Sequence, residues 1–191
     1  PDQILEIHAP DDRVASKIRP NIIALWEGNN PSLTIWIMCH MDVVPPGDLN
    51  LWDSDPYKVI EKEGKLYGRG TEDNQQGIVS ALLAVKALQE NNIPPESRIG
   101  LVFVADEEVG SKYGIQYILK EKKDIFKSTD LIIIPDAGDK KGITIEVAEK
   151  SILWIKAVTT GRQTHGSTPE KGINAHKASA HFIVKMGQLY K

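Results

Sequence analysis

Apolar positions along the first 140 residues follow two alternating spacings. Three segments are nearly unbroken apolar runs: residues 33–39, 99–105 and 131–134. Such a run is typical of a β-strand that is covered on both faces. Apolar residues of 77–88 instead recur at the i, i+3, i+4 spacing of an amphipathic helix, and a similar pattern covers residues 112–122. Apolar strands that alternate with helices predict the α/β fold class, with a mostly parallel central sheet and flanking helices.

The pattern changes near residue 142. Residues 143–147 and 152–159 resemble paired strands, and a further helical pattern begins near Asn174. We therefore expect residues 1–150 to form one domain and residues 151–191 to begin a second, smaller α+β domain. The final helical pattern has no capping or stop signal, so we expect the chain to be a piece of a longer protein.

Potential metal ligands follow each of the three apolar runs. They are His40 and Asp42 after the first run, Asp106, Glu107 and Glu108 after the second, and Asp136 after the third. Asp73 stands just before the helix that begins near Gly77. Carboxyl ends of parallel strands meet at one edge of a sheet, so these side chains can converge there. One histidine and several carboxylates, without a thiolate, suit Zn²⁺ or a similar divalent ion, which would also offset the repulsion among the carboxylates.

A single carboxylate after a strand is usually a loop residue or a helix cap. Three strands that each end in such residues, together with Asp73, make coincidence a poor explanation. The sequence therefore favours a metal site at this edge of the sheet.

Five motifs follow one another along the chain. They are Cys39-His40-Met41-Asp42 with residues 43–48, Trp52 with Asp55-Pro56-Tyr57, Gly68-Arg69-Gly70-Thr71-Glu72-Asp73, Asp106-Glu107-Glu108-Val109-Gly110-Ser111, and Pro135-Asp136. In order and spacing they resemble the co-catalytic zinc peptidases and deacylases. That family includes aminoacylase, acetylornithine deacetylase, succinyl-diaminopimelate desuccinylase, carboxypeptidase G and several dipeptidases. The resemblance implies a zinc exopeptidase-like α/β domain followed by a lid domain through which two subunits form a homodimer.

The resemblance also implies a site for two zinc ions, for which cobalt or manganese can substitute. His40, Asp73 and Asp136 would hold the first ion, and Asp73 would bridge it to the second, next to a cis peptide bond between Asp73 and Asn74. Glu108 would bind the second ion. The distant C-terminal histidine that normally completes this second ligand set has no counterpart in the sequence. We therefore expect the isolated 191-residue piece to be a poor catalyst.

Three further residues gain a role in catalysis from the resemblance. Glu107 would be the general base, which takes a proton from water activated between the zinc ions and gives it to the leaving amine. Asp42 would orient the ring of His40. His165, which on its own reads as an exposed loop residue, would hydrogen-bond the developing oxyanion, often from the partner subunit. Adjacency alone also allows Glu107 to be the ligand and Glu108 the base.

Two positions bear on the site and its substrate, and the first departs from the family pattern. After Asp73 the family commonly has one residue, then Lys and Gly, whereas this chain has Asn74-Gln75-Gln76-Gly77. We therefore expect the hydrogen bonding there to differ. Members of this family with Asp at the position of Asp136 are more often aminopeptidases and dipeptidases, whereas those with Glu there are more often deacylases. The expected reaction is hydrolysis of an amide bond in a short peptide or N-acyl amino acid; the alternative is an N-succinyl or N-acetyl amino acid deacylase.

Composition bears on partners and compartment. A formal net charge of −3 gives no reason to expect nucleic acid or an anionic membrane as a partner. The sequence has no run of about 18 apolar residues that could span a bilayer. Its single cysteine, Cys39, excludes an internal disulfide and favours a reducing compartment, so we expect a cytoplasmic protein.

Two other functions fit parts of the pattern. A phosphate-ester hydrolase also uses carboxylate-rich two-metal sites, but the sequence lacks a basic or glycine-rich phosphate cradle. An inactive homologue that serves as a binding module should have lost the base or a ligand. The sequence keeps Glu107, Glu108, His40, Asp73 and Asp136. An amide hydrolase is the leading hypothesis.

Overall fold

The computed structural model describes residues 1–139, 141–142, 144–148 and 153–189. The chain divides into two compact units, Pro1–Glu146 and Val147–Lys191, and each unit is described by itself.

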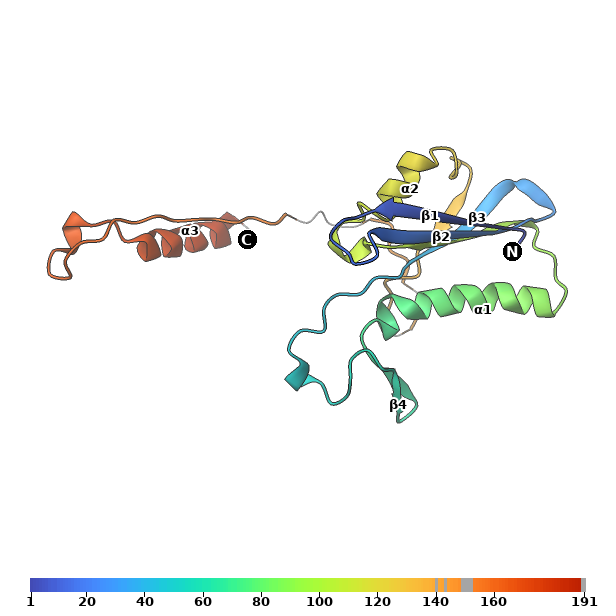
Figure 1. Cartoon of the computed structure of the whole chain (residues 1–191), viewed down its shortest axis with the longest axis horizontal. Helices are drawn as coiled ribbons and strands as arrows, with labels where there is room; N and C mark the ends of the chain where they lie inside the picture. The colour runs from blue at the N-terminus through green and yellow to red at the C-terminus, as the bar shows by residue number, and fades with distance from the viewer. Residues whose placement is uncertain (140, 143, 149–152, 190–191) are drawn as a thin grey trace. The chain divides into compact units, whose positions relative to one another are not determined.

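The first unit is built on a five-stranded sheet in the order β1-β2-β6-β3-β7 (Figure 1). The strands are β1 (Gln3–Pro10), β2 (Ile18–Trp26), β3 (Asn30–His40), β6 (Ser97–Val104) and β7 (Leu131–Ile133). β6, β3 and β7 run parallel, whereas β2 pairs antiparallel with both β1 and β6. The predicted α/β class is confirmed. The sheet is mixed because residues 3–26 form a hairpin, which needs no helical crossover.

Two helices cover opposite faces of this sheet (Figure 1). Successive residues of a strand point to opposite faces, and β6 separates the core accordingly. Helix α1 (Gln76–Glu90) packs with Leu101 and Phe103, whereas Ile118 of helix α2 (Ile115–Glu121) packs with Val102 and Val104. The apolar runs of β3 and β6 are therefore covered on both faces, as the pattern predicts.

Strand β7 differs from that prediction. Residues 131–134 are exposed to between 45% and 54%. β7 lies at the edge of the sheet, has β3 as its neighbour and is three residues long, so little of its side-chain surface is covered.

Short elements complete the first unit. They are a hairpin of β4 (Ile60–Lys62) and β5 (Lys65–Tyr67) and the turns η1 (Leu49–Leu51), η2 (Thr71–Gln75) and η3 (Glu107–Val109). Turns η2 and η3 carry candidate site residues.

The second unit contains the turn η4 (Pro169–Lys171) and helix α3 (Ala175–Leu189), with one antiparallel bridge between Arg162 and Ile173. The expected paired strands are absent from residues 144–148 and 153–159, the described parts of those segments. A lone two-stranded pair is marginal in water, and the large apolar side chains of both segments are exposed, so packing does not stabilise a pair there. No described helix is long and apolar enough to cross a membrane.

Candidate metal centre

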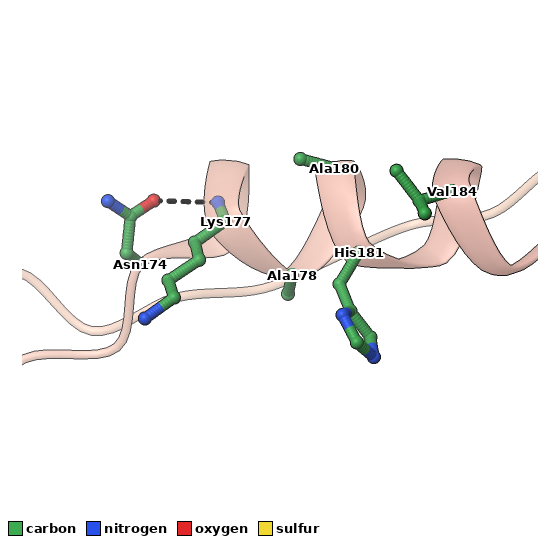
Figure 2. Close-up of a pocket in the computed structure, with 6 residues that line it drawn as sticks. All are labelled: Asn174, Lys177, Ala178, Ala180, His181 and Val184. Atoms are coloured by element: carbon green, nitrogen blue, oxygen red, sulfur yellow. Dashed lines mark hydrogen bonds between the residues drawn. The ribbon is translucent and has the colours of Figure 1, made fainter.

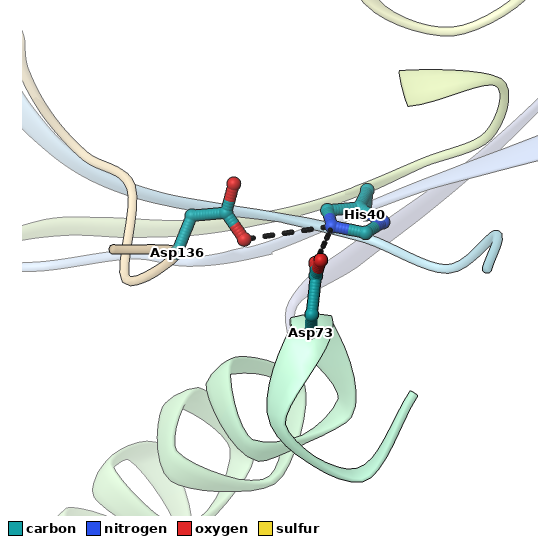
Figure 3. A group of neighbouring side chains, drawn as sticks. All are labelled: His40, Asp73 and Asp136. Atoms are coloured by element: carbon teal, nitrogen blue, oxygen red, sulfur yellow. Dashed lines mark hydrogen bonds and ion pairs between the residues drawn. The ribbon is translucent and has the colours of Figure 1, made fainter. Parts of the chain in front are cut away.

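The structure brings together His40, Asp73 and Asp136 (Figure 3). His40 is the last residue of β3, Asp73 lies in η2 just before α1, and Asp136 follows β7. One ligand atom from each residue lies within 4.8 Å of the others. Because β3 and β7 are parallel neighbours, their carboxyl ends reach the same edge of the sheet, and α1 begins there.

Both ring nitrogens of His40 have polar partners that fix the orientation of the ring. The ring is 3% exposed, and its Nε2 lies 2.7 Å from Oδ1 of Asp73 and 3.4 Å from Oδ1 of Asp136. On the other side, Nδ1 lies 2.9 Å from the backbone carbonyl oxygen of Asp42, to which it can donate a hydrogen bond. A neutral ring with its proton on Nδ1 has its lone pair on Nε2, facing the two carboxylates. A divalent metal ion requires this orientation of a histidine ligand.

The charges around His40 change its pKa. Burial of the ring alone would lower the pKa, but hydrogen bonds with Asp73 and with the Asp42 carbonyl, and the negative charge of Asp136, raise it above the ordinary value. The same negative field attracts a cation. The donor set, one imidazole nitrogen and two carboxylate oxygens, therefore fits a divalent metal ion.

Asp42 contacts more of the site than the sequence predicted. Its backbone carbonyl, rather than its carboxylate, is the closer partner of His40, because Nδ1 lies 3.7 Å from the nearer carboxylate oxygen. The carboxylate instead accepts hydrogen bonds from the backbone N–H of Glu107 at 3.0 Å and of Glu108 at 3.2 Å. One residue therefore orients the histidine and holds the turn that carries both glutamates.

Glu107 and Glu108 lie outside the three-residue cluster and reach the site through Asp42. Partial burial raises the pKa of Glu107, the positive charge of His40 acts in the opposite direction, and Asp136, Glu108 and Asp42 raise it further.

Asn74 belongs to the site, although its sequence position suggested only altered hydrogen bonding. The Asp73–Asn74 peptide bond is cis, as the family resemblance implies. The Asn74 side chain is fully buried, and its amide donates hydrogen bonds to the Asp136 carboxylate and to the carbonyl oxygen of Pro135. A Cβ on Gly77 would lie 2.4 Å from Oδ1 of Asn74, so only glycine leaves room for this amide. The buried amide thus orients Asp136.

His165 lies in the second unit, in an exposed turn. Its Nδ1 accepts a hydrogen bond from the backbone N–H of Ser167 at 3.3 Å and lies 2.8 Å from the Ser167 hydroxyl. A ring nitrogen that accepts an N–H carries no proton, so the neutral ring holds its proton on Nε2. The ring can then donate a hydrogen bond from Nε2.

The second unit also has a shallow groove along α3 (Figure 2). It is lined by Asn174, Lys177, Ala178, Ala180, His181 and Val184. Asn174 caps the helix, because its side-chain oxygen accepts the backbone N–H of Lys177 at 3.0 Å. One lysine and one histidine among small apolar side chains do not resemble the metal cluster of the first unit.

Comparisons with known proteins agree with this geometry. Residues 36–186 match the model of peptidase family M20/M25/M40. A metallohydrolase of Methanococcus maripaludis is 55% identical over 159 residues, which cover 82% of this chain and 38% of that protein. A succinyl-diaminopimelate desuccinylase of Ruegeria is 31% identical over 172 residues, which cover 88% of this chain and 43% of that protein.

A solved structure is also similar. Human carnosine dipeptidase 1 has a TM-score of 0.61 and 29% identity, over 71% of this chain and 29% of its own. The resemblance to zinc peptidases and deacylases is confirmed. The chain spans about two fifths of the length of the curated relatives that it matches.

Proposed function

Because this chain belongs to peptidase family M20/M25/M40, we propose that it carries most of a two-zinc site that hydrolyses the amide bond of a short peptide or an N-acyl amino acid. The supporting observation is the convergence of His40, Asp73 and Asp136 within 4.8 Å. These residues come from separate segments, so the fold, rather than their order in the chain, brings them together.

Zinc is the metal that the donor set favours. An imidazole nitrogen and carboxylate oxygens are ordinary zinc ligands, and zinc-bound histidines usually donate their other N–H to an oxygen, as His40 can to Asp42. Bound zinc would polarise the substrate carbonyl and activate a water molecule. We assign His40, Asp73 and Asp136 to the first ion. Asp73 and Glu108 would bind the second ion, together with a ligand from another part of the longer protein.

Glu107 is the general base in this proposal. The Asp42 carboxylate accepts the backbone N–H groups of Glu107 and Glu108 and so fixes their backbone, which lets one glutamate bind metal while its neighbour stays free to accept a proton. Glu107 would take the proton of the attacking water and transfer it to the leaving amine. His165 would donate a hydrogen bond from Nε2 to the oxyanion, with Nδ1 occupied by Ser167.

Short peptides are the first substrate class to test. The similar solved structure is a dipeptidase, and Asp136 is the residue that the family resemblance associates with peptide substrates. The desuccinylase relative supports N-succinyl amino acids as the alternative, because it matches over 88% of this chain. We also propose that residues 151–191 begin a lid domain through which two subunits form a homodimer.

The full-length protein, loaded with Zn²⁺, tests the reaction. Dipeptides, N-acetyl amino acids and N-succinyl amino acids are offered to the wild type, to Glu107→Ala and to Glu61→Ala, whose side chain lies exposed on β4. We expect Glu107→Ala to lower kcat by a factor on the order of 100 to 10,000 and Glu61→Ala to leave it unchanged. Hydrolysis of none of these amides would contradict the proposed function.

Metal content separates the roles of the two glutamates. Glu107→Ala should retain two zinc ions per subunit, whereas Glu108→Ala should lose one, because only Glu108 is assigned as a ligand. The reverse result would exchange their roles.

A further inference from the structure

A polar cluster, buried except for its two arginines, lies behind the turn that carries Glu107 and Glu108, and the proposed reaction uses none of its members. We call it the support cluster. It consists of Asp11, Arg13, Arg19, Asn21 and Asp106. The cluster contacts the segment 105–113, which contains the two glutamates.

Asn21 joins both ends of that segment. It lies in β2 and is fully buried. Its side-chain oxygen accepts the backbone N–H of Ala105 at 2.9 Å, and its amide donates to the carbonyl oxygens of Tyr113 at 2.9 Å and Ile7 at 3.2 Å. Ala105 stands two residues before Glu107, and Tyr113 stands five residues after Glu108. A single side chain therefore closes the loop between them.

Asp106 closes the same loop from inside. It is 1% exposed and has a left-handed backbone, with φ of 65°. Its Oδ2 accepts the backbone N–H of Tyr113 at 3.1 Å, and its carbonyl oxygen accepts the N–H of Ser111 at 2.6 Å. Asn21 and Asp106 thus bind the backbone carbonyl and the backbone N–H, respectively, of the same residue, Tyr113.

Two arginines offset the buried charge of Asp106. Nη1 of Arg19 lies 3.6 Å and Nη2 of Arg13 4.0 Å from Oδ1 of Asp106, an oxygen without a hydrogen bond in the described structure. Nε of Arg19 also donates to Asp11 at 2.7 Å, and Arg13 binds the same carboxylate through two nitrogens at 2.8 and 3.0 Å. A buried carboxylate without such partners would be costly. The hairpin of β1 and β2 is therefore linked electrostatically to the segment 105–113, which contains Glu107 and Glu108.

We propose that Asn21 and Asp106 are positioning residues for Glu107, an inference that rests on the proposed function. The Asp42 carboxylate holds the Glu107–Glu108 backbone from the side of the metal site, and the support cluster holds the same loop from behind. Displacement of a reacting group by about 1 Å can cost roughly 100-fold in rate. Loss of the hydrogen bonds that Asn21 and Asp106 make to the segment 105–113 should therefore lower kcat, while substrate binding and metal binding change little.

The test compares three variants of the full-length, zinc-loaded enzyme. Asn21→Ala removes all three hydrogen bonds. Asp106→Asn keeps the size of the side chain, tolerates the left-handed backbone and can still accept the Tyr113 N–H, but loses the charge that faces Arg19. Val85→Ala, on the buried face of α1, is the control for a loss of stability alone.

At a temperature where every variant is folded, we expect Asn21→Ala to lower kcat roughly 10- to 100-fold. KM and zinc content should stay within about twofold of the wild type. Asp106→Asn should cause a smaller loss of kcat, and Val85→Ala none. In a Glu107→Gln background, Asn21→Ala should cause no further loss, because residues that act through one group are not additive. Equal losses of kcat in both backgrounds would show a general structural role and overturn the proposal.

Amide hydrogen exchange gives a readout that does not depend on activity. In Asn21→Ala and in Asp106→Asn the amides of residues 105–113 should exchange on the order of 10-fold faster, while those of α1 and β3 keep their protection. If the wild type hydrolyses no amide but this loop alone loosens, the proposed function fails and the positioning of the loop stands. Unchanged exchange in the loop would overturn the positioning itself.

Discussion

Gly77→Ala should weaken metal binding without touching a ligand. The added Cβ would lie 2.4 Å from Oδ1 of Asn74 and 2.8 Å from the carbonyl oxygen of Pro135, whereas ordinary contacts begin at 3.4 Å. Both distances are shorter than real Cβ contacts, so the backbone at Pro135 has to shift and the Asn74 side chain has to move as well. Its amide then loses the carboxylate of Asp136, which it holds beside His40.

The magnitude follows from two opposing effects. Forcing one carbon into a packed site costs about 1–3 kcal/mol. Alanine in place of glycine in a helix returns up to about 1 kcal/mol. We therefore expect a net loss of about 1–2 kcal/mol, which lowers Tm by roughly 2–8 °C in a protein of this size. Loss of a side chain that orients a ligand weakens metal binding about 10- to 100-fold.

Calorimetric titration of the metal-free protein with Zn²⁺ measures the affinity, and thermal unfolding with a chelator present measures the stability. Gly138→Ala is the matched control, because its Cβ would meet nothing within 4 Å. Wild-type zinc affinity in Gly77→Ala, or an equal loss in Gly138→Ala, would show that the Asn74 amide does not hold Asp136 in place for the metal.

Three further predictions concern single groups. Burial alone would raise the pKa of Asp130, but hydrogen bonds from the Lys127 backbone N–H and the Trp36 ring lower it, so the ionised carboxylate stabilises the fold at pH values above its unfolded pKa of about 4. The difference in unfolding free energy between wild type and Asp130→Asn, measured in urea, should shrink as the pH falls through the folded pKa. A difference that stays constant with pH would contradict this. Burial raises the pKa of Cys39 to about 11, so Ellman's reagent should react at least about 100-fold faster in urea than with native protein at pH 7.5. Ser167→Ala keeps the backbone N–H that Nδ1 of His165 accepts, so His165 should stay in the Nε2–H tautomer in ¹⁵N NMR spectra; a shift to the Nδ1–H tautomer would show that the Ser167 hydroxyl, rather than its N–H, sets the tautomer.

The main elements could be predicted from the sequence because their signals are local. The apolar runs of β3 and β6 and the i, i+3, i+4 spacing of α1 each lie within a few residues. His40 and Asp136 could be predicted for the same reason, since each follows an apolar run and the carboxyl ends of parallel strands meet at one edge of the sheet. Asp73 was found because it stands where α1 begins.

The supporting residues could not be found in this way, because their partners are distant in sequence. Asn21 bonds to Ala105 and Tyr113, which lie 84 and 92 positions away. In the sequence it is one asparagine in an apolar strand. Asn74 had a weak signal, since a departure from the family pattern directly after Asp73 marks a change in local bonding. The turn of Asp42, with its carbonyl toward His40 and its carboxylate toward the glutamates, is a property of tertiary structure.

The binding of a metal ion by His40, Asp73 and Asp136 can be observed in crystals of the full-length protein grown with Zn²⁺ and measured on both sides of the zinc absorption edge. We predict an anomalous peak with Nε2 of His40 and one oxygen each of Asp73 and Asp136 about 2.0–2.2 Å away. Anomalous peaks only elsewhere in the protein, with these three side chains bonded to one another as in Figure 3, would contradict metal binding by these residues.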